Sequence, residues 1–233
     1  MWSSLSGAAS RGLIAAGLAA AAADVQGAET PVAIELVIAI DTSASVDRRE
    51  FTLQLNGLAQ AFRDPDVIRA VENLGRLGAA VTVIQFGGAG DTKVSIPWTH
   101  IEGARDAKAV SYLLSLVRRW HTASETSIGS AIGDGMALIA SNHYDGQRRV
   151  IDISGDGRHN GNADLSAARA AARTAGIVIN GLPIDAEDQT LSAYYQSEVI
   201  AGAGAFIQPA DGFDDFARAI REKLIRELQP PES

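Results

Sequence analysis

Apolar runs and amphipathic stretches alternate along the chain from about residue 34 to residue 228. Residues 34–40, IELVIAI, are apolar at all but one position and rich in β-branched side chains, as in a strand that is covered on both faces. The next stretch, residues 47–63, instead spaces its large apolar residues as one face of a helix does. These residues are Phe51, Leu55, Leu58 and Phe62. The pattern predicts a buried strand followed by an amphipathic helix.

The same two patterns recur to the end of the chain. Further strands are predicted at residues 80–86, 94–98, 148–154, 177–184 and 205–210, and further helices at residues 106–120, 127–141, 163–174 and 213–228. Pro97 favours an edge position for its strand. Parallel strands need crossover connections, and helical crossovers cover both faces of a sheet. The alternation therefore predicts a single α/β domain with a doubly wound, mostly parallel sheet of about six strands and helices on both faces.

The N-terminal segment has a different character from the rest. Arg11 precedes an apolar run over residues 12–23, and small residues follow. This is typical of a secretory signal peptide, and the run is shorter than the roughly 20 residues that span a bilayer. We expect residues 1–27 to be a signal peptide and residues 28–233 to form the mature domain, without a stable membrane span. The alternative is an alanine-rich tail on a cytoplasmic protein.

Composition narrows the class of protein. The 233 residues carry a formal net charge of −8, which argues against a nucleic-acid surface, since such a surface needs clustered Lys and Arg. The chain has no cysteine, so an exported form would be stabilised without disulfides. An exported, cysteine-free domain fits the bacterial periplasm.

Candidate chemistry begins directly after the first predicted strand. Asp41, Ser43 and Ser45 form the pattern D-x-S-x-S in a loop that leads into a helix. Ligands of doubly wound sheets bind outside the carboxyl ends of the strands, and carboxylate and hydroxyl oxygens are hard ligands that suit Mg²⁺. Helix capping by Ser45 or Asp47 is the alternative interpretation, because Asp and Ser also cap helices.

Two later segments add oxygens at the same predicted edge. Thr126 lies in a loop that opens the helix at residues 127–141, and Asp156 follows the strand at residues 148–154 between two glycines. We expect both loops to lie at the strand ends. Capping explains one of the five oxygen-bearing side chains but not all of them, so a divalent-cation site is the better interpretation.

With these residues the sequence resembles the von Willebrand factor A-type (vWA) domain and its metal-ion-dependent adhesion site. Segments 151–157 and 213–217 are also similar to a smaller, uncharacterised group of exported bacterial members. The resemblance implies that Ser43, Ser45 and often Thr126 contact the metal directly, while Asp41 and Asp156 act directly or through water. It implies further that a partner's Glu or Asp fills the open coordination position.

The expected function is therefore divalent-cation-dependent protein binding. Mg²⁺ is preferred because the five side chains are short and include no bidentate Glu, with Mn²⁺ or Ca²⁺ possible. A structural accessory domain of an envelope complex with a vestigial site is one alternative. A metal-assisted hydrolase is the other, although the motifs of hydrolases, nucleotide triphosphatases and dinucleotide-binding proteins are absent. His159 and Asn160 are expected to have a plain loop role, and Asp152 to be paired or exposed within its strand.

Overall fold

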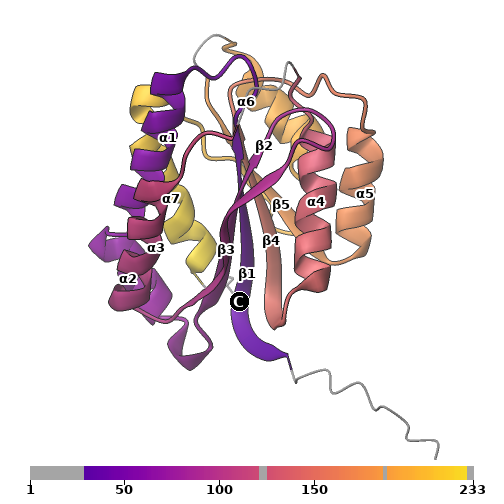
Figure 1. The fold of residues 1–233 in the computed structure, drawn as a ribbon. Helices are drawn as coiled ribbons and strands as arrows, with labels where there is room; N and C mark the ends of the chain where they lie inside the picture. The colour runs from indigo at the N-terminus through magenta and orange to yellow at the C-terminus, as the bar shows by residue number, and fades with distance from the viewer. Residues whose placement is uncertain (1–28, 121–124, 186–187, 230–233) are drawn as a thin grey trace, which may run out of the picture.

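A computed structural model describes residues 29–120, 125–185 and 188–229. The predicted signal peptide lies outside these described residues. The centre of the fold is a five-stranded sheet (Figure 1). Its strands are β1 (Thr30–Asp41), β2 (Ala79–Phe86), β3 (Lys93–Ile101), β4 (Tyr144–Gly155) and β5 (Ile177–Pro183).

The strand order is β3-β2-β1-β4-β5, and β1 is the central strand. All neighbours are parallel except β3, which runs antiparallel to β2 at the sheet edge, so the edge position expected from Pro97 is confirmed. The predicted strand at residues 205–210 does not form a ladder. It contributes only two isolated bridges to the β5 side, at Ile207 and Ala210, and this reduces the six predicted strands to five.

Helices cover both faces of the sheet, as predicted. They are α1 (Arg48–Ala61), α2 (Pro65–Glu72), α3 (Ala104–Leu116), α4 (Ile128–Ser141), α5 (Leu165–Thr174), α6 (Leu191–Tyr194) and α7 (Phe216–Leu228). Helices α1, α2, α3 and α7 lie on one face, and α4 and α5 lie on the other (Figure 1). The sheet with its two helical layers is the doubly wound α/β architecture expected from the sequence.

The central strand supplies side chains to two separate cores. Ile34, Leu36, Ile38 and Ile40 of β1 pack with α1 and α7 in one core. Val37 and Ala39 pack with α4 and α5 in the other. A strand that is buried on both faces needs apolar residues at odd and even positions alike, and this explains the continuous apolar run.

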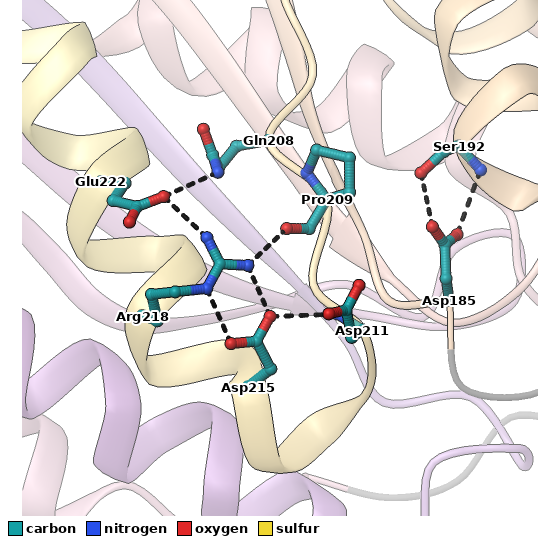
Figure 2. Close-up of polar contacts among 8 residues, drawn as sticks. All are labelled: Asp185, Ser192, Gln208, Pro209, Asp211, Asp215, Arg218 and Glu222. Atoms are coloured by element: carbon teal, nitrogen blue, oxygen red, sulfur yellow. Dashed lines mark hydrogen bonds and ion pairs between the residues drawn. The ribbon is translucent and has the colours of Figure 1, made fainter.

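Helix α7 is attached to the sheet by charged groups as well as by apolar packing. The buried Lys223 ammonium lies 2.9 Å from Oδ1 of Asp152 on β4 and 2.6 Å from Oε1 of Glu227. Asp152 is thus buried and paired, as expected. Near the start of α7, Arg218 contacts Asp215 and Glu222 and donates to the Pro209 carbonyl (Figure 2). These contacts hold the segment before α7 against the helix.

None of the helices within the described residues combines the length and the apolar character needed to cross a membrane.

Candidate metal site

The candidate site lies where the strand order reverses. From β1 the chain proceeds to β2 on one side of the central strand, and β4 and β5 lie on the other side. Asp41 is the last residue of β1 and Asp156 follows the last residue of the neighbouring β4. Ligands of open α/β sheets bind at this kind of switch point, beyond the carboxyl ends of the strands.

The loop between β1 and α1 brings three of the five candidate residues together. The backbone N–H of Ser43 donates to Oδ1 of Asp41 at 2.7 Å. The hydroxyls of Ser43 and Ser45 lie 3.0 Å apart, as expected from their alternate positions in the loop. Both hydroxyls are therefore on the same side of the loop.

Capping of α1 does not use these hydroxyls. Asp47 is the N-cap, and its carboxylate accepts from the N–H of Glu50 at 2.8 Å while Glu50 accepts from the N–H of Asp47 at 2.7 Å. This reciprocal pair is a capping box. Of the two capping residues considered from the sequence, Asp47 is the cap and Ser45 is not, so a different role is needed to explain Ser45.

Asp156 joins the site from the loop between β4 and α5. The Ser45 hydroxyl donates to Oδ1 of Asp156 at 2.9 Å, across 111 residues of sequence. Gly155 allows the two loops to approach each other, because a Cβ on it would lie 2.7 Å from Oδ2 of Asp41. Any larger residue at this position would collide with the carboxylate.

Thr126 lies next to Gly157, the residue after Asp156, but is positioned differently from the expectation. It is in the connection between α3 and α4 and does not follow a strand; Ser127 joins it to the strand edge by donating to the Gly87 carbonyl at 2.7 Å. A Cβ on Gly157 would lie 3.3 Å from Oγ1 of Thr126, so Gly157 provides room for this hydroxyl. All five candidate residues thus lie around the ends of β1 and β4.

Asn160 has a more specific role than the loop role that we expected. Its side-chain oxygen accepts from the N–H of Thr126 at 2.7 Å, and its own N–H donates to the Thr126 carbonyl at 3.1 Å. This double contact fixes the backbone of Thr126 against the loop that carries Asp156. His159 is also bonded within its loop, through Nε2 to the Ala163 carbonyl at 2.7 Å.

The surroundings of the Asp41 carboxylate indicate whether a cation fits the site. Asp41 is 0% exposed, and its Oδ2 has no hydrogen-bond partner among the described residues. Burial raises the pKa of Asp41 to about 7; the N–H of Ser43 opposes this effect and the charge of Asp156 adds to it. A buried, under-bonded carboxylate at the same strand ends as the hydroxyls of Ser43, Ser45 and Thr126 is the environment that a cation would stabilise, so the donor set fits a hard divalent ion.

Arg119 is a residue near the site that sequence patterns missed. Its Nη2 donates to three carbonyls of the β1–α1 loop, those of Thr42, Ser43 and Val46. The loop therefore has a fixed backbone before any ligand arrives. No motif indicated this contact, because Arg119 lies more than 70 residues from the loop in sequence.

Two acidic residues after β5, Asp185 and Asp188, have hydrogen-bond partners in the structure. Both carboxylate oxygens of Asp185 accept from Ser192 (Figure 2). Asp188 accepts from Arg158 at 2.9 Å and from Thr190, and these bonds lower its pKa to about 2. These two carboxylates therefore have local structural partners.

Comparison with protein families matches residues 31–232 to the family described as "Protein of unknown function (DUF1194)". A search of curated proteins gives no match.

Solved structures with the same fold share little sequence with the chain. Proximal thread matrix protein 1 from the mussel byssus is 14% identical, with a TM-score of 0.60 over 87% of this chain and 47% of that protein. Another structure of the same mussel protein, with a TM-score of 0.58, is described as having a zinc-occupied MIDAS motif. The von Willebrand factor type A structure from Catenulispora acidiphila is 15% identical, with a TM-score of 0.57 over 85% of this chain and 43% of that one.

BatB from Bacteroides thetaiotaomicron, a conserved hypothetical protein, is 20% identical, with a TM-score of 0.52 over 84% of this chain and 98% of that one. The chain spans less than half the length of the mussel and Catenulispora proteins. At these identities the likeness establishes the fold alone. The chain belongs to the DUF1194 family, and its fold is that of von Willebrand factor A-type domains.

Proposed function

We propose that the domain binds a divalent cation with Asp41, Ser43, Ser45, Thr126 and Asp156 and uses the cation to bind a carboxylate of a partner protein. The observation that carries this proposal is the continuous set of oxygens from Ser43 through Ser45 to Asp156, with separations of 3.0 and 2.9 Å. Two loops far apart in sequence contribute to this set. Helix capping does not account for it, because Asp47 caps α1.

The chemistry of the donors supports the choice of partner. Three of the five side chains are neutral hydroxyls, so a cation held mainly by them keeps enough positive charge to attract another carboxylate. Mg²⁺ is the preferred ion because short monodentate side chains suit its compact octahedral shell. Mn²⁺ fits the same donors, and Ca²⁺ is the less favoured candidate. In this proposal the domain is a binding module and not an enzyme.

The proposed setting is the bacterial periplasm, with residues 1–27 removed as a signal peptide and residues 28–233 forming the mature domain. Adhesion is the general role proposed here; a pilus adhesin, SpaC from Lactobacillus rhamnosus GG, has the same fold at 14% identity and a TM-score of 0.55. N-terminal sequencing of protein from the envelope fraction should begin between residues 24 and 30. A chain that still begins at Met1 would contradict the signal peptide.

Partner capture tests the proposed function. The immobilised chain should capture a partner from an envelope extract in Mg²⁺ and lose it in EDTA. Thr126→Ala should behave as the wild-type chain does in EDTA, while Asp47→Ala, which alters the same edge without removing a candidate ligand, should retain capture. Amidation of the captured partner's carboxylates should abolish rebinding. Unchanged capture in EDTA would instead favour an accessory domain with a vestigial site.

A further inference from the structure

Two adjacent tyrosines lie behind the two loops of the candidate site. Tyr194 ends α6, and Tyr195 begins a one-turn π-helical segment, Tyr195–Val199. Single π-helical turns are rare and occur often at functional sites. The rings lie nearly perpendicular, at 73° with centroids 6.2 Å apart, so the two hydroxyls reach different places.

Tyr194 contacts the loop that carries Asp156. Its hydroxyl oxygen accepts from the backbone N–H of His159 at 3.3 Å. The guanidinium of Arg158 lies over its ring, 4.8 Å from the centroid. Tyr194 therefore holds the segment that directly follows Asp156 and Gly157.

Tyr195 lies inside the core beneath the site. It is 0% exposed and packs among the apolar residues between the sheet and α4 and α5. Its hydroxyl is buried and has no hydrogen-bond partner among the described residues. A buried hydroxyl without a partner costs free energy, so a polar group at this position needs an explanation.

The unpartnered oxygen of Asp41 faces the same small space. A Cβ built on Gly155 would lie 2.7 Å from Oδ2 of Asp41 and 3.1 Å from the hydroxyl oxygen of Tyr195. Only a glycine leaves this space open. One buried donor without an acceptor and one buried acceptor without a donor therefore both border the position that a Cβ of residue 155 would take.

We propose that Tyr195 is a positioning residue of the metal site: its hydroxyl and Oδ2 of Asp41 are not hydrogen-bonded in this structure, and with a cation bound the hydroxyl would donate to Oδ2 in the space beside Gly155. The inference rests on the proposed cation site. Ser43 already donates to Oδ1, so Tyr195 would fix the second oxygen and hence the plane of the carboxylate. Partners behind a metal ligand orient it in this way, and their loss typically weakens metal binding about 10-fold to 100-fold.

The protonation state of Tyr195 agrees with a donor role. Burial, together with the charges of Asp41 and Asp156, raises the pKa of Tyr195 well above its ordinary value. The hydroxyl therefore keeps its proton throughout the neutral range.

If Tyr195 positions Asp41, loss of its hydroxyl should weaken cation binding without destabilising the fold. Tyr195→Phe keeps the buried ring and removes only the unpartnered hydroxyl. The metal-free protein should then unfold at the same temperature or a higher one. The same change should weaken cation binding. A ring that acts only in packing would leave cation affinity unchanged.

The experiment is a calorimetric titration of Mn²⁺ and Mg²⁺ into the full chain, its Tyr195→Phe variant and Tyr144→Phe. Tyr144 is a buried tyrosine at the start of β4, at the opposite end of the sheet, and controls for loss of a hydroxyl. Thermal unfolding in EDTA accompanies each titration. We expect Tyr195→Phe to bind the cation at least about 10-fold more weakly than wild type, and Tyr144→Phe to bind it like wild type. The thermal unfolding midpoint of Tyr195→Phe in EDTA should not fall below that of wild type.

Wild-type affinity in Tyr195→Phe would overturn the positioning role while leaving the proposed cation site intact. Weaker binding that comes with a lower midpoint in EDTA would also overturn it, since the ring's packing would then be the cause. Absence of cation binding by the wild-type chain would overturn the proposed function and the inference together.

Discussion

The contribution of buried ion pairs to the stability of the fold can be measured at Lys223 of α7. Its side chain is 0% exposed, and its ammonium contacts the carboxylates of Asp152 and Glu227 at 2.9 and 2.6 Å. Asn180 on β5 adds a hydrogen bond to Glu227 at 2.9 Å. Two buried carboxylates thus share one buried cation between α7 and the strands β4 and β5.

Lys223→Met should destabilise the protein strongly at pH 8. The replacement is of similar length, so the main effect is to leave Asp152 and Glu227 buried without their cation. Breaking a buried ion pair in this way costs about 3–5 kcal/mol, a large part of the roughly 5–15 kcal/mol that stabilises a typical domain.

The deficit should shrink at lower pH. Burial raises the pKa of Asp152 to about 7, and the charge of Glu227 adds to this effect while Lys223 opposes it. Removal of Lys223 raises that pKa further. An acid whose pKa is higher in the folded state holds a proton that the unfolded chain releases, so stability falls as pH rises through the interval between the two pKa values. At pH 5 the carboxylate of the variant is protonated, and much of the penalty disappears.

Urea unfolding followed by far-UV circular dichroism in EDTA, at pH 8 and pH 5, measures this difference. Arg226→Met is the matched control, because Arg226 is exposed on the same helix and lies over the ring of Phe206, as Lys223 does. The control should lose only about 0.5–1 kcal/mol. The reasoning fails if Lys223→Met loses less than about 1 kcal/mol at pH 8, or if its deficit does not decrease at pH 5.

Three further predictions concern the loops of the site. Arg119→Met should lower the free energy of unfolding in urea by about 1.5–3 kcal/mol, because three loop carbonyls lose a charged donor. An unchanged free energy of unfolding would show that the loop does not need Arg119 for its stability. Asn160→Ala should weaken Mg²⁺ binding in a calorimetric titration about 10-fold, since the Thr126 N–H loses its side-chain acceptor and only the backbone bond from residue 160 to the Thr126 carbonyl remains; wild-type affinity would contradict this. Asp47→Ala should cost about 1 kcal/mol through the lost cap of α1, with Mg²⁺ affinity unchanged within twofold; a large loss of affinity would assign Asp47 to the site.

Much of the fold follows from local patterns. The apolar run at residues 34–40 forms the centre of β1 because a central strand is covered on both sides, and Gly176 ends α5 with a φ of 70°. Helix α2 was missed although Asp64 caps it and Pro65 occupies its first turn, because eight residues give a weak periodic signal. Residues 205–210 pair with the β5 side only through isolated bridges, so the apolar run there does not form a strand.

The sequence indicated the candidate ligand residues but not the residues that contact and position their loops. D-x-S-x-S is a local pattern, and the switch-point geometry predicts that Asp156 lies near it. Arg119, Tyr195 and Asn160 act through contacts between segments far apart in sequence. Their contributions depend on how the loops fold over the sheet, and no spacing within the sequence encodes that.

Calorimetric titration of Mg²⁺ into the wild-type chain and Asp41→Ala shows whether these loops hold a cation. We expect saturable binding at one site in the wild type and its loss in the variant, with both proteins folded by circular dichroism in EDTA. Equal binding by the two proteins, or no binding by a folded wild-type chain, would contradict the proposed cation site.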